Sequence, residues 1–259
     1  MEEIRNRLKD LGVCVIIPTY NNVGTIQQVI HSVSEYCDDV LVVCDGPTDG
    51  TEELVRQCDV RVLAYRPNKG KGKALTTGFR EALRLGFRYA ITLDSDGQHY
   101  ADDIPAFAQA IAEHPDALLI GSRGLEHDNM SQGSTFANKF SNFWFTVQTG
   151  KKLPDTQSGY RLYPLWKMGR MRLMTSRYEA ELEMLVRSAW RNISIIPIPV
   201  KVYYPPQEER VSHFRPGKDF TRISILNAFF CFAAFFYGYP SMFLRKIFVP
   251  LPPPVADVQ

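Results

Sequence analysis

The sequence predicts an α/β fold with a mainly parallel sheet that carries helices on both faces. Up to about residue 122, short runs rich in Val, Ile and Leu alternate with amphipathic stretches of helical period. Short, nearly continuous apolar runs are typical of strands that are buried on both faces of a sheet. With 45% apolar and 22% charged residues among 259, the chain is long enough for one large α/β domain or two small ones.

Each predicted strand is a short apolar run bounded by turn-forming residues. Five such runs are Val13–Pro18, Asp39–Cys44, Val60–Ala64, Tyr89–Leu93 and Ala117–Gly121. Amphipathic helices fit the stretches Thr25–Tyr36, Thr51–Gln57, Lys71–Leu85 and Asp102–Glu113. Strands that alternate with helices run parallel, so we expect the loops after the first four strands to meet at one edge of the sheet, where ligands bind in such folds.

Charge, the N-terminal segment and cysteine spacing argue against a nucleic-acid-binding protein, a signal peptide and a disulfide or zinc framework. The net charge is +2, and no basic run indicates a nucleic-acid partner. The segment Met1–Arg5 lacks the apolar core of a signal peptide. The five cysteines show no C-x-x-C spacing, and two of them fall in predicted buried strands. We interpret them as small hydrophobic residues in a reducing compartment rather than as disulfides or zinc ligands.

The loop after the fourth predicted strand carries two carboxylates one residue apart. Alternate residues of an extended chain share a side, so Asp94, Asp96 and Gln98 can present oxygen atoms to one hard cation, as Mg²⁺ or Mn²⁺ prefers. Taken alone, the motif fits an Asp-rich turn before the next helix about as well as it fits a metal site. His99 follows it and is expected to be a hydrogen-bonding loop residue, because hard cations prefer oxygen.

The other loops at this edge add polar and basic groups. The first is Pro18-Thr-Tyr-Asn-Asn22, and the second places Asp45 at a strand end before a helix N-terminus. The third, from Asn68 to Lys73, has two glycines and three lysines, which suits a diphosphate. Together the loops predict a nucleotide-diphosphate site. Its expected contacts are Pro18, Thr19, Tyr20, Asn22, Asp45, Asn68, Lys69, Gly70, Lys71, Asp94 and Ser95.

In order and spacing, these four segments resemble the signature of family 2 glycosyltransferases with the GT-A fold. One departure is Cys44-Asp45-Gly46-Pro47, where the family more often has two acidic residues followed by Gly-Ser. Asp45 alone would then supply any carboxylate contact to the base or ribose. The resemblance implies a nucleotide-diphosphate sugar as donor, UDP-linked or GDP-linked, with Asp94, Asp96 and Gln98 as metal ligands.

The second half is similar to the branch of dolichyl-phosphate mannose synthase and related polyprenyl-phosphate sugar transferases. The matching segments are Gly121–Arg123, Asp155–Arg161, Tyr178–Leu185, Pro197–Val202 and Arg210–Ser212. The branch usually has Ser-Lys where this chain has Ser212-His213. The resemblance implies that the acceptor or its phosphate is met by Arg123, Lys139, Ser141, Arg161, Arg210, Ser212 and His213.

A metal held by Asp94 and Asp96, with Lys69 or Lys71 nearby, would neutralise the leaving diphosphate. The resemblance implies a single displacement that inverts the anomeric carbon. A hydroxyl acceptor needs a general base, whereas a phosphate acceptor is already ionised. We expect the catalytic residues among Asp96, Asp155, Glu181 and Glu183. Alternate helix positions lie about 200° apart, so Glu181 and Glu183 cannot both face one site; surface charge is the alternative for them, and loop capping for Asp155.

The stretch Ile223–Leu244 contains no charged residue and has about the length of a bilayer-spanning helix. Gly238 and Pro240 are expected to interrupt it near one end, as Ser224 and Asn227 do near the other. Basic residues bracket the run, which favours a helix that lies in an anionic membrane surface. The alternative is a buried core helix with a lid role. We therefore expect a glycosyltransferase domain over residues 1–215 and a membrane-associating tail over 216–259.

The leading hypothesis is an inverting, metal-dependent glycosyltransferase at the cytoplasmic face of the plasma membrane, peripheral or monotopic. Its acceptor would be lipid-linked, a polyprenyl phosphate or a glycolipid, with a role in glycolipid or cell-envelope biosynthesis. A nucleotidyltransferase is the first rival, but its Gly-rich loop normally follows the first strand, where this chain has Pro18-Thr-Tyr-Asn-Asn22. A non-catalytic nucleotide-sugar-binding subunit is the second, and the intact carboxylates Asp94 and Asp96 argue against it.

Overall fold

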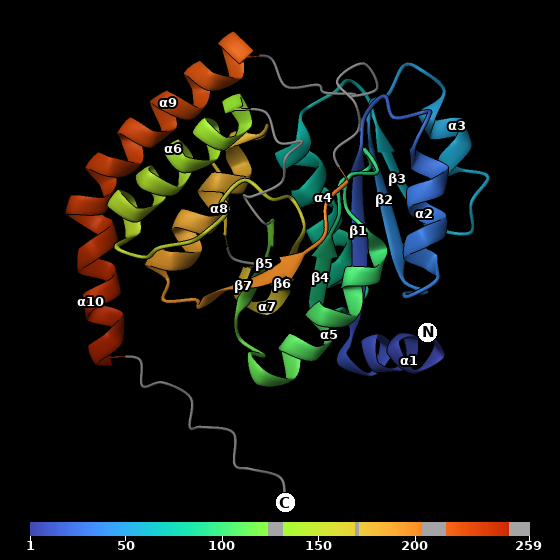
Figure 1. Cartoon of the computed structure of the whole chain (residues 1–259), viewed down its shortest axis with the longest axis horizontal. Helices are drawn as coiled ribbons and strands as arrows, with labels where there is room; N and C mark the ends of the chain where they lie inside the picture. Colours follow the sequence, from blue (N-terminus) through green and yellow to red (C-terminus); the bar gives the residue numbers. More distant parts are fainter. Residues whose placement is uncertain (124–131, 169–170, 204–215, 249–259) are drawn as a thin grey trace, which may run out of the picture.

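A computed structural model describes residues 1–123, 132–168, 171–203 and 216–248. Within them, a seven-stranded sheet has the order β3-β2-β1-β4-β6-β5-β7 (Figure 1). The strands are β1 Val13–Thr19, β2 Val40–Asp45, β3 Arg61–Tyr65, β4 Tyr89–Thr92, β5 Leu118–Arg123, β6 Arg161–Pro164 and β7 Ile195–Val200. The predicted α/β class and the five predicted strands are confirmed, with ends within two residues of those expected.

Strand direction determines which loops share an edge of the sheet. Strands β1, β2, β3 and β4 are parallel, whereas β6 is antiparallel to β4 and pairs Arg161 with Thr92. The start of β6 therefore lies beside the end of β4. This pairing brings the segment 155–160 to the same edge as the loops that follow β1, β2 and β4.

The sequence pattern did not reveal β6 or β7. Strand β6 has only four residues, Arg-Leu-Tyr-Pro, which is too short to show a period. Strand β7 contains Pro197 and Pro199. It lies at the edge of the sheet, where proline is tolerated because one row of backbone groups needs no partner strand.

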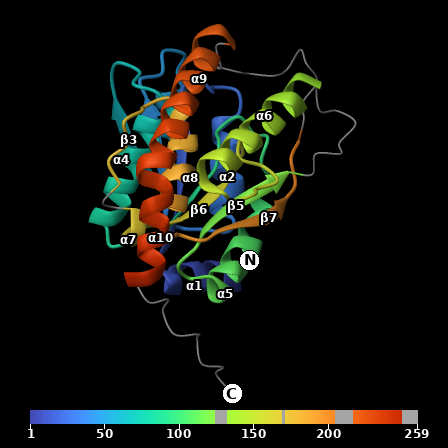
Figure 2. The same cartoon turned by 90° about the vertical axis from the view of Figure 1, so that its left-hand side faces the viewer.

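Helices cover both faces of the sheet (Figures 1 and 2). Along β1, Val13, Val15 and Ile17 belong to one core cluster, while Cys14 and Ile16 belong to the other. The first face is covered by α1 Glu2–Leu11, α2 Ile26–Ser34, α3 Thr51–Val55, the short 3₁₀ turn Ala101–Asp103 and α5 Ile104–Glu113. The second is covered by α4 Lys71–Arg84, α6 Gln132–Thr149, α7 Leu165–Met168 and α8 Glu179–Trp190.

The apolar segment near the C-terminus forms one long helical rod that packs along α6 and α8, as both views show (Figures 1 and 2). The rod consists of α9 Pro216–Ala233, a π-helical turn η3 Ala234–Gly238 and α10 Tyr239–Phe248. The expected interruption at Gly238 and Pro240 is wrong, because the π turn that ends at Gly238 leads directly into α10, which contains Pro240. A Cβ on Gly238 would lie 2.5 Å from the Trp190 ring, so glycine here allows the rod to pack closely.

One side of the rod belongs to the hydrophobic core. Leu226, Phe230 and Ala234 are buried in the same cluster as Phe145 of α6 and Trp190 of α8. Within the described residues, the predicted second domain thus shares its core with the first, and the boundary at residue 215 stays a prediction. The helix Asp219–Phe248 is also long and apolar enough to cross a membrane by length and composition.

Candidate active site

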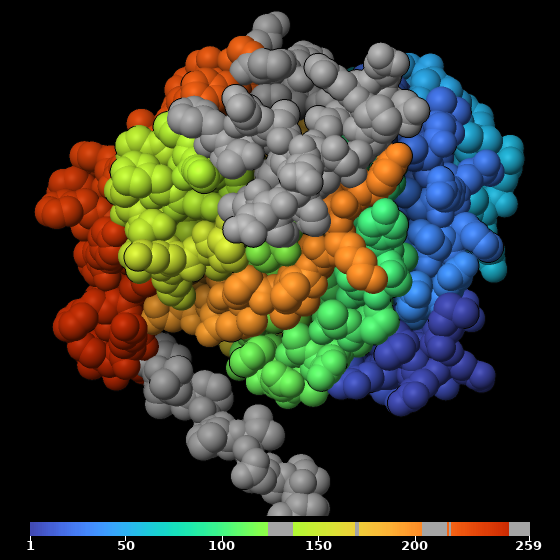
Figure 3. All heavy atoms as spheres, viewed as in Figure 1, coloured from blue at the N-terminus to red at the C-terminus, as the bar shows by residue number. Residues whose placement is uncertain are grey.

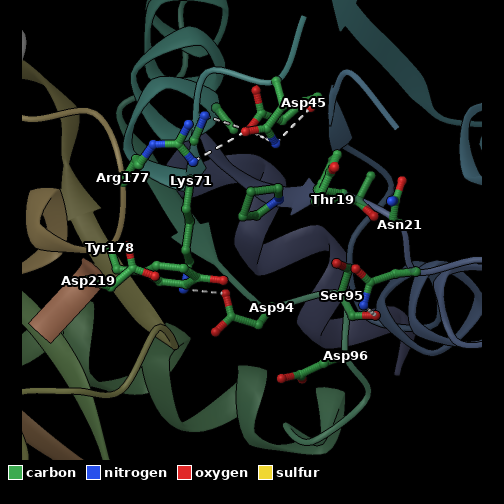
Figure 4. Close-up of a pocket in the computed structure, with 16 residues that line it drawn as sticks. Thr19, Asn21, Asp45, Lys71, Asp94, Ser95, Asp96, Arg177, Tyr178 and Asp219 are labelled. Atoms are coloured by element: carbon green, nitrogen blue, oxygen red, sulfur yellow. Dashed lines mark hydrogen bonds and ion pairs between the residues drawn. The ribbon is translucent and has the colours of Figure 1, made fainter. Parts of the chain in front are cut away.

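A pocket of about 500 Å³ opens at the carboxyl edge of the parallel strands. It collects the loops that sequence reasoning placed there (Figure 4). The predicted residues that line it are Pro18, Thr19, Tyr20, Asn22, Asp45, Asn68, Gly70, Lys71, Asp94, Ser95 and Asp96. The remaining lining residues, which were not among the predicted contacts, are Asn21, Ala74, Arg177, Tyr178 and Asp219.

Hydrogen bonds connect the two loops that follow β1 and β2 at the pocket. The Asn21 side chain donates to Thr48 Oγ1 at 3.3 Å, and its Oδ1 accepts from the Thr48 amide at 2.8 Å. The Asn22 amide donates to Thr51 Oγ1 at 2.9 Å. Asn21 adopts φ 52°, a left-handed conformation that asparagine tolerates better than most residues. The loop after β1 is therefore tied to the loop after β2.

Asp45 holds the second and third loops together. Its carboxylate accepts from the backbone amides of Lys69 and Gly70, each at 2.7 Å, and from Asn68 Nδ2 at 2.9 Å. The side chain is nearly buried. Asp45 thus shapes the glycine-containing loop, in addition to lining the pocket where a contact to the donor was predicted.

The two candidate lysines of the third loop point to different places. Lys69 is exposed and does not line the pocket; its ammonium lies 5.5 Å from the centre of the Tyr65 ring. Lys71 begins α4, and its Nζ lies 2.7 Å from Asp94 Oδ1 and 2.9 Å from Glu181 Oε2. Burial lowers the pKa of Lys71, but attraction to these two carboxylates outweighs burial and raises it above the ordinary value.

The carboxylates after β4 suit a divalent cation. Burial, together with the neighbouring charge of Asp94, raises the pKa of Asp96 to about 6, so a bound cation would relieve a real repulsion. The described lining residues include four carboxylates, on Asp45, Asp94, Asp96 and Asp219, against only the two cations Lys71 and Arg177. No cluster of three His, Cys, Asp or Glu ligands exists among the described residues. Two carboxylates fit Mg²⁺ or Mn²⁺, since such ions complete their shells with water and substrate phosphate.

Gln98 does not line the pocket, although it was predicted as a third metal ligand. Its backbone amide donates to Asp96 Oδ1 at 3.0 Å, and its carbonyl accepts from the Tyr203 amide at 2.8 Å. Gln98 thereby orients Asp96 through the backbone. His99 stacks against Tyr160 at 5.3 Å. Burial lowers the pKa of His99 to about 4, so the ring is neutral near pH 7.

The structure separates the two glutamates of α8. Glu181 does not line the pocket, but it pairs with Lys71, which does. Glu183 is fully buried elsewhere and accepts from the amides of Met174 and Thr175 at 2.8 and 2.9 Å. It also pairs with Arg187 at 2.8 Å. The catalytic role of Glu183 stays a prediction, and in the structure its carboxylate holds the segment before α8 in place.

Asp155, the fourth catalytic candidate, is buried in a structural network. Its carboxylate pairs with Arg123 Nε at 2.6 Å and accepts from Asn138 Nδ2 at 2.8 Å and from the Gln157 amide at 3.0 Å. Burial raises the pKa of Asp155, but the Arg123 contact outweighs burial and lowers it below the ordinary value. Asp155 does not line the pocket, and its geometry matches the loop-capping alternative.

The residues predicted to meet the acceptor are dispersed. Arg161 is fully buried and donates to the carbonyls of Thr156, Ser158 and Glu181 at 2.7 to 3.0 Å, so it braces the backbone instead of facing the pocket. Ser141 accepts from Thr156 Oγ1 at 2.7 Å, and Lys139 is exposed on α6. The other predicted acceptor residues, Arg210, Ser212 and His213, lie outside the described residues.

Comparisons with known proteins show what the chain is similar to. The model of the family described as "Glycosyl transferase family 2" matches residues 14–164. A UDP-N-acetylglucosamine–dolichyl-phosphate N-acetylglucosaminyltransferase of Methanococcus voltae is 28% identical over 220 residues, covering 76% of this chain and 88% of its own. Glycosyltransferase AglJ of Haloferax volcanii is 30% identical over 214 residues, covering 80% and 68%.

A polyprenol monophosphomannose synthase of Mycolicibacterium smegmatis is 28% identical over 200 residues, covering 72% of this chain and 75% of its own. Among solved structures, glucosyl-3-phosphoglycerate synthase from Mycobacterium tuberculosis, in complex with Mn²⁺, UDP and phosphoglyceric acid, superposes with a TM-score of 0.66. It is 18% identical, and the match covers 90% of this chain and 81% of that one. At this identity the likeness shows a shared fold.

Proposed function

The chain belongs to glycosyl transferase family 2, and we propose that it transfers a sugar from a UDP- or GDP-linked donor to a lipid-linked phosphate at a membrane surface. The family sets aside the nucleotidyltransferase alternative. The observation that carries the proposal is the pocket beyond β1, β2 and β4, where the paired carboxylates Asp94 and Asp96 face the glycine-containing loop. A solved structure of the same fold contains Mn²⁺ and UDP, which supports the donor class.

The charges of the pocket require a cation when the donor binds. Four carboxylates and two cationic side chains line its described wall, so a diphosphate alone would add negative charge to an already negative site. Mg²⁺ or Mn²⁺, when bound, supplies Lewis-acid and electrostatic stabilisation of the leaving diphosphate. Asp94 and Asp96 would hold it, and Gln98 orients Asp96 through the bond from its backbone amide to that carboxylate.

The acceptor determines whether a base is needed. In an inverting displacement the acceptor oxygen bonds to the anomeric carbon while the bond to the diphosphate oxygen breaks, and that oxygen keeps the electron pair. A phosphate acceptor carries no proton that must be removed, whereas a hydroxyl does. If the acceptor is a hydroxyl, Glu181 is the base that the geometry favours, because it alone among Glu181, Glu183 and Asp155 contacts a residue that lines the pocket, Lys71.

The long C-terminal rod supplies the surface for a lipid. Its outward side bears large exposed aromatics, among them Phe229, Phe232, Phe235, Phe236 and Phe243, and Phe143 of α6 is exposed as well. Figure 3 shows this rod, in red, along one edge of the molecule beside α6. A contiguous exposed apolar face of this kind marks an interaction site. Arg222, near the start of the rod, and Arg245 and Lys246, near its end, suit an anionic surface.

Hydrogen bonds from the start of α10 to α6 and to the end of α8 favour a rod that rests on the membrane instead of crossing it. Tyr239 OH donates to the Val147 carbonyl at 2.5 Å, Asn192 Nδ2 to the Met242 carbonyl at 3.0 Å, and Ser241 Oγ to the Trp190 carbonyl at 3.3 Å. A spanning helix would have to leave these partners and the shared core. Asp219, in the first turn of the rod, also lines the pocket, so the membrane-facing helix begins at the site. We therefore propose a monotopic or peripheral enzyme at the cytoplasmic face.

The test is a transfer assay with purified protein, Mn²⁺ and labelled UDP- or GDP-hexoses. One set of reactions offers a polyprenyl phosphate in liposomes and a second offers a glycolipid with a free hydroxyl. We expect metal-dependent transfer to the polyprenyl phosphate. Transfer only to the glycolipid would refute the phosphate acceptor, and absence of transfer to either lipid with every donor would refute the proposed reaction.

A further inference from the structure

We propose that Arg177 is the cation that binds the diphosphate of the donor, in place of the lysines of the glycine-containing loop. The inference rests on the proposed function, since it assumes that a nucleoside diphosphate occupies the pocket. It assigns a role to a residue that the sequence pattern did not single out, and it concerns binding of the leaving group.

Both candidate lysines are already engaged. Lys71 is held between two carboxylates at 2.7 and 2.9 Å, so its charge is matched before any ligand arrives. Lys69 is exposed outside the pocket and lies over the Tyr65 ring. A diphosphate in the pocket would have to break a partly buried ion pair to recruit Lys71. Neither lysine is therefore positioned to receive it.

Arg177 lines the same pocket and makes fewer polar contacts than Lys71. Its Nη1 donates one hydrogen bond, to Asn68 Oδ1 at 3.5 Å, and among the described residues it makes no ion pair within 4.0 Å. A guanidinium has five N–H donors in a planar fork that matches phosphate oxygens. Most of these donors remain available for a ligand. Figure 4 shows Lys71 extending toward Asp94, with Arg177 on the side of the pocket nearer Asp45.

The surrounding backbone is shaped around the Arg177 side chain. The side-chain Nδ2 of Asn68 donates to Asp45 Oδ2 at 2.9 Å. This hydrogen bond orients the side-chain amide so that its Oδ1 faces Arg177. Gly70 has φ +98°, and a Cβ there would lie 2.5 Å from Arg177 Cγ. The Lys73 amide donates to the Ser176 carbonyl at 2.9 Å. The glycine-containing loop thus packs against the segment that carries Arg177.

In this arrangement, one side of the pocket would bind the metal ion and another would bind the phosphates. The carboxylates Asp94 and Asp96 on one side would hold the cation, and Arg177 on another side would donate to the phosphate oxygens. Charge-assisted bonds of a guanidinium to phosphate are stronger than neutral hydrogen bonds and are often bidentate. A diphosphate between them would meet positive charge from both sides.

Calorimetry of UDP and GDP, each with Mn²⁺, tests the proposal on the wild type, Arg177→Ala, Arg177→Lys and Lys69→Ala. Arg172→Ala is the matched control, because Arg172 is an exposed arginine five positions away that does not line this pocket. We expect Arg177→Ala to weaken binding of the preferred diphosphate about ten- to a hundred-fold. Arg177→Lys should restore part of the loss, and Lys69→Ala and Arg172→Ala should bind as the wild type does.

A parallel titration with uridine and guanosine separates phosphate binding from pocket shape. Nucleoside affinity should be unchanged in Arg177→Ala, because the lost contact is to phosphate. Wild-type affinity of Arg177→Ala for the diphosphate, or an equal loss for the nucleoside, would overturn the assignment of Arg177. If the wild type itself binds neither diphosphate, the proposed donor class is wrong, and the inference falls with it.

Discussion

Lys71 and Glu181 form an ion pair of 2.9 Å between the first turns of α4 and α8, and the same ammonium lies 2.7 Å from Asp94 Oδ1. One side chain thus joins three elements that are far apart in the sequence. It joins Asp94, the carboxylate proposed to hold the metal, to Glu181 of α8. The geometry of the site therefore depends on packing between α4 and α8 as well as on the loop motifs.

Lys71→Met should destabilise the protein because it leaves two carboxylates close together without their shared cation. Breaking a buried ion pair costs about 3 to 5 kcal/mol, and we expect the low end because the pair is partly exposed. Urea unfolding measures the change. Lys69→Met is the control and should unfold as the wild type does. A Lys71→Met protein as stable as the wild type would show that the bridge contributes nothing to the fold.

Gly159→Ala should disturb the ion pair between Lys71 and Asp94. An added Cβ would collide with the Asp94 carboxylate and lie 2.8 Å from Lys71 Nζ. We expect weaker Mn²⁺ binding and less transfer, with an unchanged far-UV circular dichroism spectrum. Gly24→Ala, where a Cβ meets nothing within 4 Å, should behave as the wild type. Equal Mn²⁺ affinity in both variants would show that the space beside Gly159 is not needed for Asp94 to bind the metal.

Asp155 should make stability depend on acid pH. Burial raises its pKa, but Arg123 outweighs burial and lowers the folded-state pKa below the ordinary value. The stabilisation is therefore complete above the unfolded pKa of about 3.9 and is lost as the pH falls through the folded pKa. The difference in unfolding free energy between the wild type and Asp155→Asn should shrink below about pH 4. A difference that stays constant from pH 7 to pH 3 would contradict this.

The two sides of the C-terminal rod should respond differently to substitution. Phe232→Ser and Phe236→Ser remove exposed aromatics, so flotation with anionic liposomes should weaken while the unfolding free energy stays the same. Phe230→Ala, in the core, should instead lower the unfolding free energy by about 3 to 5 kcal/mol. If liposome binding is unaffected by the two exposed substitutions together, the rod is not the membrane contact.

Local sequence was sufficient for the parallel half of the fold and for the four loops that form the pocket. Strand runs such as Val13–Thr19 carry their own pattern, and the order of the strands brings their loops together. Other features depend on long-range packing. The choice between Glu181 and Glu183 follows from how α8 docks on α4, and Arg177 reaches the pocket because Gly70 leaves room for it. No local periodicity encodes such contacts.

The C-terminal rod is a second example of a feature that the sequence alone predicted only in part. Composition indicated an apolar helix in Ile223–Leu244, but Gly238 and Pro240 suggested an end that the structure does not have. The reason is long-range packing: the π turn at Ala234–Gly238 packs Gly238 against Trp190 of α8, and α10 continues through Pro240. A single sequence shows the residues that usually break helices, but not the neighbour that allows a helix to continue.

The most direct test of the account is a thermal-shift measurement of UDP and GDP, with Mn²⁺ or with EDTA, on the wild type and Asp96→Asn. A ligand at about a hundred times its Kd stabilises a protein by about 2.7 kcal/mol. We expect the preferred diphosphate to raise the Tm of the wild type only when Mn²⁺ is present, and to leave Asp96→Asn unchanged. An equal shift in EDTA, or in Asp96→Asn, would contradict a metal-dependent donor site at Asp94 and Asp96.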